Sequence, residues 1–135
     1  MPPQRIVILV AEDNSAIRKL TVDILQASGY IALEAENGLD ALAALNREKP
    51  DAVLSDCNMP RMNGFTLLHA IRASESLHDL SFILMSGEST PEMAAAAYAA
   101  GANGFLGKPF SIYTLLEMVE SLLGKAREET LGCNS

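Results

Sequence analysis

The chain has 135 residues with 17 acidic and 10 basic side chains, which leaves a formal net charge of −7. Apolar residues make up 49% of it and charged residues 20%, a composition typical of one folded domain and not of a disordered chain. The acidic balance argues against nucleic-acid binding, because Lys and Arg must neutralise the phosphates. No apolar run approaches the roughly 20 residues that span a bilayer, so we expect no membrane association.

The N-terminus and the cysteines bear on the cellular compartment. Only five apolar residues lead up to Ala11 and Glu12, too few for the core of a signal peptide. Cys57 and Cys133 have neither the spacing of a metal site nor that of a disulfide framework. We therefore expect a cytoplasmic protein.

Apolar runs alternate with helical patterns along the whole chain. The first run, residues 6–10, is continuous and β-branched, which is typical of a strand buried on both faces of a parallel sheet. The predicted elements are, in chain order, a strand at 6–10, a helix from Asn14 or Ser15 to Gly29, a strand at 31–35, a helix from Asn37 to Pro50, a strand at 52–55, a helix at about 65–74, a strand at 81–85, a helix from Thr90 and Pro91 to Gly101, a strand at 104–107 and a helix from Ser111 to about Lys125.

Five strands that alternate with five helices, joined by short loops, predict a doubly wound α/β fold with a five-stranded parallel sheet. No repeat, linker or change of composition marks a second domain. We assign residues 1–127 to this one domain and residues 128–135 to a short polar tail.

Reactive side chains follow four of the predicted strands. Glu12 and Asp13 follow the first strand, Asp56 the third, Ser86 the fourth and Lys108 the fifth. Ligands of open α/β sheets bind beyond the carboxyl ends of the strands. We therefore expect three carboxylates, one hydroxyl and one ammonium group to meet at one edge of the sheet.

Three crowded carboxylates repel one another unless a cation neutralises them. Mg²⁺ prefers oxygen ligands, keeps several waters and leaves positions for a phosphoryl oxygen. Lys108 and Ser86 supply donors for the remaining phosphoryl oxygens. Asp56 stands alone on its strand and is a competent nucleophile toward phosphorus, so the residues predict metal-assisted phosphoryl transfer to Asp56.

Four sequence blocks carry a family resemblance. They are Ala11-Glu12-Asp13-Asn14, residues 55–64 (SDCNMPRMNG), Met85-Ser86-Gly87-Glu88 and residues 101–110 (GANGFLGKPF). In this order and at these strand ends, they resemble the signature blocks of bacterial response-regulator receiver domains. The resemblance runs from about Arg5 to Lys125, and the pattern is most similar to stand-alone, chemotaxis-type regulators.

The resemblance implies a flavodoxin-like receiver fold and a role for each site residue. Asp56 would accept a phosphoryl group from a phosphohistidine on a histidine kinase or a histidine phosphotransfer protein. Mg²⁺ would be held by Asp13, Asp56 and the backbone carbonyl of Asn58, with Glu12 acting through water. The same resemblance implies a cis Lys108–Pro109 bond.

The resemblance also implies a switch, in which Ser86 moves toward the phosphoryl group and Phe105 rotates inward. Glu12 stands where Asp is more frequent, Ser86 where Thr is commoner, and Phe105 lacks a phenolic hydroxyl. Phe105 has an ordinary reading as a packed core ring. Cys57 is interpreted as a packing residue and not a redox sensor, and His69 and His78 as surface residues.

We therefore expect a monomeric single-domain response regulator that signals through a protein-binding surface on the fourth helix, fifth strand and fifth helix. Its only chemistry would be its own phosphorylation and dephosphorylation, and its output partner is unidentified. One alternative is a receiver excised from a larger regulator. A second, an aspartyl-nucleophile phosphatase, is disfavoured because its Asp-x-Asp-x-Thr run is missing, and a flavin module because no Ser/Thr-rich phosphate loop follows the first strand.

Overall fold

The computed structural model describes residues 5–124. Strands and helices alternate along this part of the chain, as the sequence predicts. Their bounds are β1 (Val7–Ala11), α1 (Ser15–Ala27), β2 (Ile31–Ala35), α2 (Gly38–Arg47), β3 (Ala52–Asp56), α3 (Gly64–Arg72), β4 (Ser81–Ser86), α4 (Pro91–Ala99), β5 (Gly104–Gly107) and α5 (Ile112–Leu123). None of these helices is long and apolar enough to cross a bilayer.

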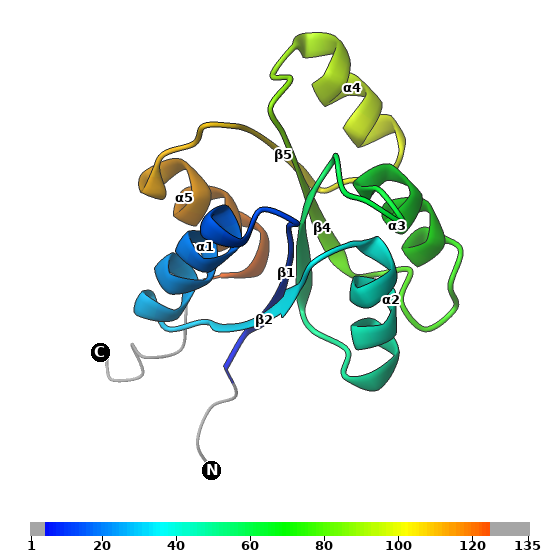
Figure 1. The fold of residues 1–135 in the computed structure, drawn as a ribbon, viewed down its shortest axis with the longest axis horizontal. Coiled ribbons are helices and arrows are strands. Elements are labelled where there is room, and N and C mark those ends of the chain that lie inside the picture. The colour runs from blue at the N-terminus through cyan, green and yellow to red at the C-terminus, as the bar shows by residue number, and fades with distance from the viewer. Residues whose placement is uncertain (1–4, 125–135) are drawn as a thin grey trace.

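The five strands form one parallel sheet in the order β2-β1-β3-β4-β5. Helices α1 and α5 cover one face of the sheet, and α2, α3 and α4 cover the other (Figure 1). The predicted doubly wound, flavodoxin-like fold is confirmed. The strand order reverses between β1 and β3, and in such sheets the crevice beyond the carboxyl ends of these strands is where ligands bind.

The helix starts are fixed by side-chain caps, each of which accepts a hydrogen bond from the backbone N–H three residues further on. The capping residues are Asn14, Asn37, Asn63, Thr90 and Ser111. The cap at Asn63 was not predicted, because it lies inside a loop whose Pro and Gly content hides the start of α3. As a result α3 begins at Gly64 and ends at Arg72, whereas the sequence predicts about 65–74.

The C-terminal end of α5 also differs from the prediction. The helix ends at Leu123, and Gly124 follows it with a φ of 85°. This left-handed conformation is one that glycine adopts without steric cost. Lys125, the predicted end of the helix, and the predicted tail at residues 128–135 lie outside the described residues.

The core has two parts, one on each face of the sheet. The part beneath α2, α3 and α4 contains Leu9, Val53, Leu67, Ile71, Phe82 and Leu84, and the part beneath α1 and α5 contains Ile8, Val10, Leu25, Leu54, Ile83 and Leu115. Every residue of β3 is buried. This central strand, buried on both faces, carries Asp56 as its last residue.

Strand ends lie one residue later than predicted at three places. β1 covers 7–11 and not 6–10, and β3 and β4 each extend by one residue, to Asp56 and Ser86. The parallel ladder causes the extension, since Asp56 pairs with Met85 and Ser86 with Gly107. Asp56 and Ser86 therefore belong to rigid strands and not to the loops after them.

Candidate functional site

The site lies at the carboxyl edge of the sheet. Glu12 and Asp13 follow β1, Asp56 ends β3, Ser86 ends β4 and Lys108 follows β5. The backbone N–H of Glu12 donates to the Ala35 carbonyl (3.0 Å), so the chain after β1 is still tied to β2. Four strands therefore fix the five side chains that the sequence predicts to meet.

The three carboxylates do come together. One oxygen each from Glu12, Asp13 and Asp56 lies within 4.8 Å of the other two. Glu12 is 1% exposed and Asp56 6% exposed, whereas Asp13 is exposed. Two of the three carboxylates that form this acidic pocket are thus buried, and the third, that of Asp13, is open to solvent.

Lys108 places one positive charge against the two buried carboxylates of this cluster. Its Nζ lies 2.8 Å from Glu12 Oε1 and 2.9 Å from Asp56 Oδ1. Its backbone N–H donates to the Ser86 carbonyl (2.7 Å), which fixes the start of its side chain. Burial alone lowers the pKa of Lys108, but the hydrogen bonds to Glu12 and Asp56 outweigh burial and raise that pKa above its ordinary value.

The pKa of Glu12 is also raised, but here burial is the cause and the hydrogen bonds oppose it. Burial raises the pKa of Glu12, and the bonds from Lys108 and from the Asn14 N–H (3.1 Å) offset that rise only in part. Both shifts have the same sense, since each group holds its proton more tightly than usual. A pocket of three carboxylates around one ammonium group attracts cations, and this is the physical basis for metal binding.

The donor set fits a hard divalent cation. All three side chains offer carboxylate oxygens, and Asn58 lies two residues after Asp56, in the loop that follows β3. Mg²⁺ takes such oxygens together with water molecules, and it has little affinity for the nitrogen and sulfur ligands that zinc prefers. The described residues thus fit the ion that the sequence predicts.

Ser86 and Phe105 occupy different positions relative to the pocket. Ser86 is fully buried, and its Oγ accepts a hydrogen bond from the Glu88 N–H (3.0 Å). The hydroxyl is therefore held by the β4–α4 loop. Phe105 is half-buried and packs against the core beneath α2, α3 and α4.

The remaining interpreted residues behave as packing or surface groups. Cys57 is buried, and burial together with Asp56 raises the pKa of its thiol, which makes it a poor nucleophile. His69 and His78 are both exposed. The Lys108–Pro109 bond is cis, as the resemblance implies.

Arg18 is a site residue that the sequence did not reveal. Its Nη1 donates to the Glu12 carbonyl (2.7 Å) and its Nε pairs with Glu34 Oε1 (3.0 Å). Arg18 thus ties α1 and β2 to the backbone that carries Glu12. The one sequence signal is its spacing, four residues after the cap Asn14, which brings it to the helix face above that cap.

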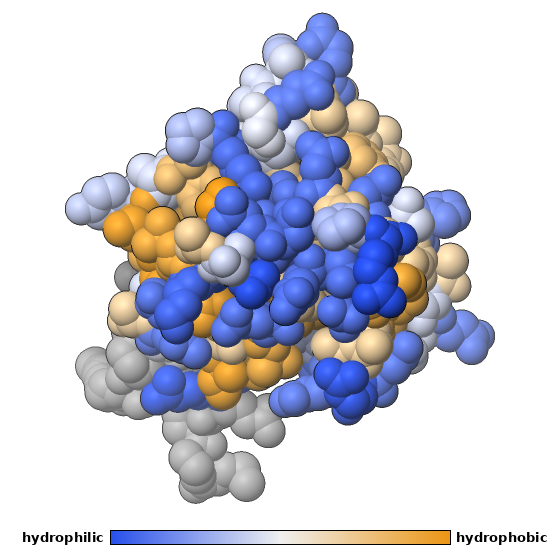
Figure 2. Space-filling model, viewed as in Figure 1, coloured by the Kyte–Doolittle hydropathy of each residue, from blue (hydrophilic) through white to orange (hydrophobic). Residues whose placement is uncertain are grey.

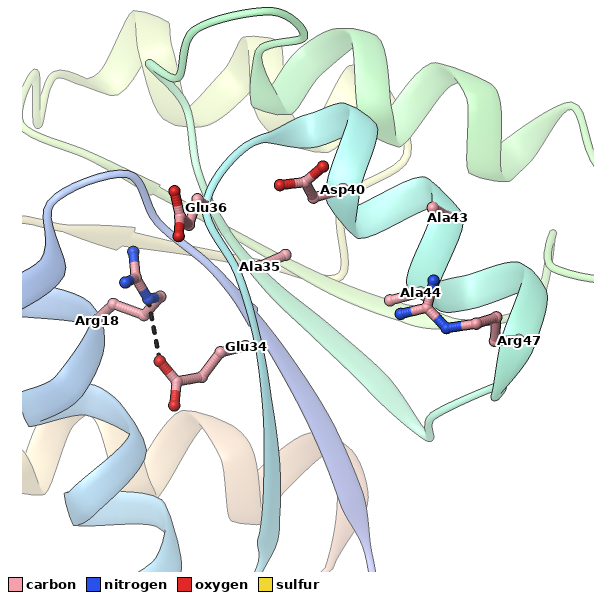
Figure 3. Close-up of a pocket in the computed structure, with 8 residues that line it drawn as sticks. All are labelled: Arg18, Glu34, Ala35, Glu36, Asp40, Ala43, Ala44 and Arg47. Carbon is pink, nitrogen blue, oxygen red and sulfur yellow. Dashed lines mark hydrogen bonds and ion pairs between the residues drawn. The ribbon is translucent and has the colours of Figure 1, made fainter.

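Arg18 also borders a hollow of about 320 Å³ between α1, β2 and α2 (Figure 3). The charged residues around it are Arg18, Glu34, Glu36, Asp40 and Arg47. Charges of both signs line this hollow, so it lacks the single sign of the carboxylate pocket.

A third feature is apolar. A hollow of about 280 Å³ is lined by Ile17, Leu20, Thr21, Lys108, Pro109 and Phe110. Figure 2 shows apolar surface at the left, over α1 and α5, beside a hydrophilic middle. Leu20 is 60% exposed, so the acidic pocket is flanked by an apolar patch on the side of α1.

This fold and this acidic pocket define a class of protein. A family model described as the response regulator receiver domain matches residues 8–120, and the chain belongs to that family. Receiver domains act in two-component signalling with a histidine kinase as partner, and they are typically not true enzymes.

Within the family, the chain is similar to chemotaxis regulators of the CheY type. It is 37% identical to the chemotaxis protein CheY-3 of Vibrio cholerae over 85% of this chain and 89% of that protein. It is 34% identical to CheY of Pseudomonas aeruginosa over 85% of this chain and 94% of that protein. It is also 36% identical to the transcriptional regulator NtrC of Salmonella typhimurium, over 93% of this chain but 26% of that protein.

Solved structures of receiver proteins are also similar to this chain. The structure of Vibrio cholerae CheY4 matches with a TM-score of 0.84 and 32% identity, over 89% of this chain and all of that one. The receiver domain of a sensor histidine kinase from Pseudomonas aeruginosa matches with a TM-score of 0.82 and 26% identity, over 90% of this chain and all of that one. That domain holds a magnesium ion in its active-site cleft.

Proposed function

We propose that this protein is a phosphorylation-controlled switch in which Asp56 accepts a phosphoryl group from a phosphohistidine. The donor is a histidine kinase or a histidine phosphotransfer protein. The observation that carries the proposal is the position of Lys108 Nζ between Glu12 and Asp56, within a pocket that Asp13 completes. Here a buried carboxylate has both a fixed cation and a cation-binding cluster beside it.

In the proposed step, a carboxylate oxygen of Asp56 attacks phosphorus, and a new P–O bond forms while the P–N bond of the phosphohistidine breaks. The imidazole leaves with the electron pair of that bond and takes a proton from solvent. Mg²⁺ held by the carboxylates would supply positive charge to the phosphoryl oxygens. Ser86 ends β4, the strand beside β3, and Lys108 follows β5; both supply further donors to these oxygens.

Each acidic residue has its own part. Asp13, Asp56 and the Asn58 carbonyl would hold the metal, and Glu12 would act through water while it orients Lys108. The burial of Glu12 and the exposure of Asp13 support this division. A buried Glu12 keeps Lys108 in place, whereas Asp13, which is exposed, would be accessible to an ion from solvent.

Phosphorylation changes the protein surface in this proposal. The phosphoryl group adds about −1.5 to −2 charges at neutral pH, and Ser86 turns toward it. The Glu88 N–H donates to Ser86 Oγ, so a turn of the Ser86 side chain is transmitted to the β4–α4 loop. Phe105 lies on β5, the strand beside β4. Its rotation would alter the surface of α4, β5 and α5 to which a protein target binds.

The proposal is tested by phosphorylation in vitro. The purified chain is incubated with acetyl phosphate and Mg²⁺, and its intact mass is measured. We expect the mass of one added phosphoryl group, and no added mass when a chelator is present from the start of the incubation. The Asp56→Asn variant should gain nothing, and Asp23→Asn, an exposed residue of α1, should behave as the unchanged protein.

Phosphoryl incorporation that persists in Asp56→Asn would refute the assignment. Continuous turnover of a diffusible phosphate ester at ordinary enzyme rates would instead support a phosphatase.

A further inference from the structure

The loop between Asp56 and α3 is closed at its base. The Gly64 N–H donates to the Cys57 carbonyl (3.0 Å), and the Cys57 N–H donates to the Met85 carbonyl on β4 (2.7 Å). The loop therefore leaves the sheet and returns to it at one fixed point. Between these ends it carries Asn58, whose carbonyl the proposed function assigns to Mg²⁺.

The far side of this loop is held by a different element, α2. Gly38 is the first residue of α2 and is buried, and its N–H donates to the Met62 carbonyl (3.0 Å). The start of α2 is held in place by its cap, since the buried side chain of Asn37 accepts a hydrogen bond from the Asp40 N–H (2.8 Å). The contact thus joins a rigid helix end to the loop that follows Asp56.

Only glycine fits at this contact. A Cβ placed on Gly38 would lie 2.7 Å from Met62 Cβ and Cγ, and closer still to the Met62 carbonyl oxygen. Backbone atoms cannot move aside as the end of a flexible side chain can. Any larger residue at this position must therefore push the loop away from α2.

The loop is also held in a conformation that it would not adopt by itself. Arg61 has a φ of 70°, a left-handed value that non-glycine residues rarely adopt. The Met62 N–H donates to the Pro60 carbonyl (2.7 Å) across Arg61, and Met59 is buried. Such conformations persist where the surroundings impose them, and Gly38 is part of those surroundings.

We infer that Gly38 is a positioning residue for the metal site, because its contact with Met62 holds the loop that presents the Asn58 carbonyl. This inference rests on the proposed function for the assignment of Asn58 to Mg²⁺. Gly38 touches neither the metal nor the phosphoryl group. Gly38 acts through the loop. It lies at the start of α2, a helix that carries none of the three carboxylates of the pocket.

The test compares Gly38→Ala with Gly87→Ala. Gly87 lies in the β4–α4 loop beside the pocket, and a Cβ there meets nothing within 4 Å. Magnesium chloride is titrated into each unphosphorylated protein, and binding is followed by backbone amide NMR shifts. We expect a Kd for Mg²⁺ that is about tenfold higher for Gly38→Ala, as for other residues that orient metal ligands, and unchanged for Gly87→Ala.

Phosphorylation by acetyl phosphate gives a second readout. In Gly38→Ala the Mg²⁺ concentration for half-maximal rate should rise by the same factor, with the rate at saturating Mg²⁺ much less affected. A purely structural role predicts a lower thermal midpoint with an unaltered Kd, and that result would overturn the inference. If the helix start is independent of the loop, alanine should stabilise α2 because its helix propensity exceeds that of glycine, and this outcome would overturn it too.

A second variant covers the case in which Gly38→Ala does not fold. Met62→Gly keeps the carbonyl that accepts from the Gly38 N–H but removes the Cβ and Cγ that pack against Gly38 and leaves the backbone of residue 62 freer, without any new overlap. We expect a Kd for Mg²⁺ raised about threefold, in the direction of other residues that support metal ligands. An unaltered Kd in Met62→Gly contradicts the inference. A wild-type chain that binds Mg²⁺ but is not phosphorylated refutes the phosphoacceptor proposal alone, and the Gly38 inference is then decided by the Kd values.

Discussion

Lys108 supplies the positive charge beside the two buried carboxylates of the pocket. Its ammonium group pairs with Glu12 and Asp56, of which the first is 1% exposed and the second 6% exposed. A buried carboxylate that loses the cation paired with it keeps the cost of its desolvation without that compensation. Lys108 and a bound Mg²⁺ would therefore have the same effect, because each places a positive charge between the carboxylates.

This equivalence predicts opposite effects of Lys108→Met. The metal-free protein should lose about 3 kcal/mol of unfolding free energy, because two buried carboxylates lose their partner. Mg²⁺ should bind more tightly than to the unchanged protein, since no ammonium group competes for the oxygens. Urea unfolding in chelator and in excess Mg²⁺ measures both effects, and equal losses in the two conditions would contradict the idea of a shared role.

The pH dependence of the same variant checks the sign. The pKa of Lys108 is raised in the folded protein above its ordinary value of 10.5. The contribution of the ammonium group is thus fully present below pH 10.5 and is lost as the pH rises through the higher folded pKa. The difference in stability between the unchanged chain and Lys108→Met, measured in chelator, should therefore shrink as the pH rises above 10.5 and stay constant below that pH until the solution is acidic enough to protonate Glu12.

At the scale of elements, Arg72 joins segments that are far apart in the sequence. From the end of α3 its guanidinium group donates to the carbonyls of His78 (2.9 Å), Leu80 (2.6 Å) and Gly101 (2.8 Å), and to Asn103 Oδ1 (2.8 Å). Asn103 Oδ1 also accepts from the Phe82 N–H (2.8 Å). One side chain thus links the ends of α3 and α4 to the starts of β4 and β5.

Arg72→Lys should therefore destabilise the fold, although it keeps the charge. Lysine cannot reproduce the planar fork of donors, and the loss of two or more charged hydrogen bonds should cost about 2 to 4 kcal/mol in urea unfolding. Arg47→Lys, an exposed position on α2, serves as the control and should change stability by less than about 0.5 kcal/mol. An equally small effect for Arg72→Lys would show that its bonds contribute nothing net.

Most elements were predictable from sequence, because strands buried on both faces and capped helices leave strong local signals. The site residues at four strand ends followed from the strand map alone. What sequence could not show depends on contacts between distant segments. The bond from Arg18 to the Glu12 carbonyl, the overlap that excludes a side chain at Gly38, and the links of Arg72 all join residues whose proximity only the folded chain creates.

At the scale of the whole molecule, the net charge of −7 has a local counterpart. Three of the carboxylates converge at the sheet edge, where two are buried beside one ammonium group. The receiver fold brings them there from two strands, and Gly38 and Arg18 hold the connecting backbone from α2 and α1. The fold as a whole thus positions Asp56 for the transfer that we propose.

The most direct test of that transfer locates the phosphoryl group on the chain. After treatment with acetyl phosphate and Mg²⁺, borohydride reduces an aspartyl phosphate to homoserine, and peptide mass spectrometry identifies the altered position. We expect homoserine at position 56 and at no other aspartate, with none in a sample that contains chelator throughout. Homoserine at Asp13 or elsewhere, with residue 56 still aspartate, would contradict it.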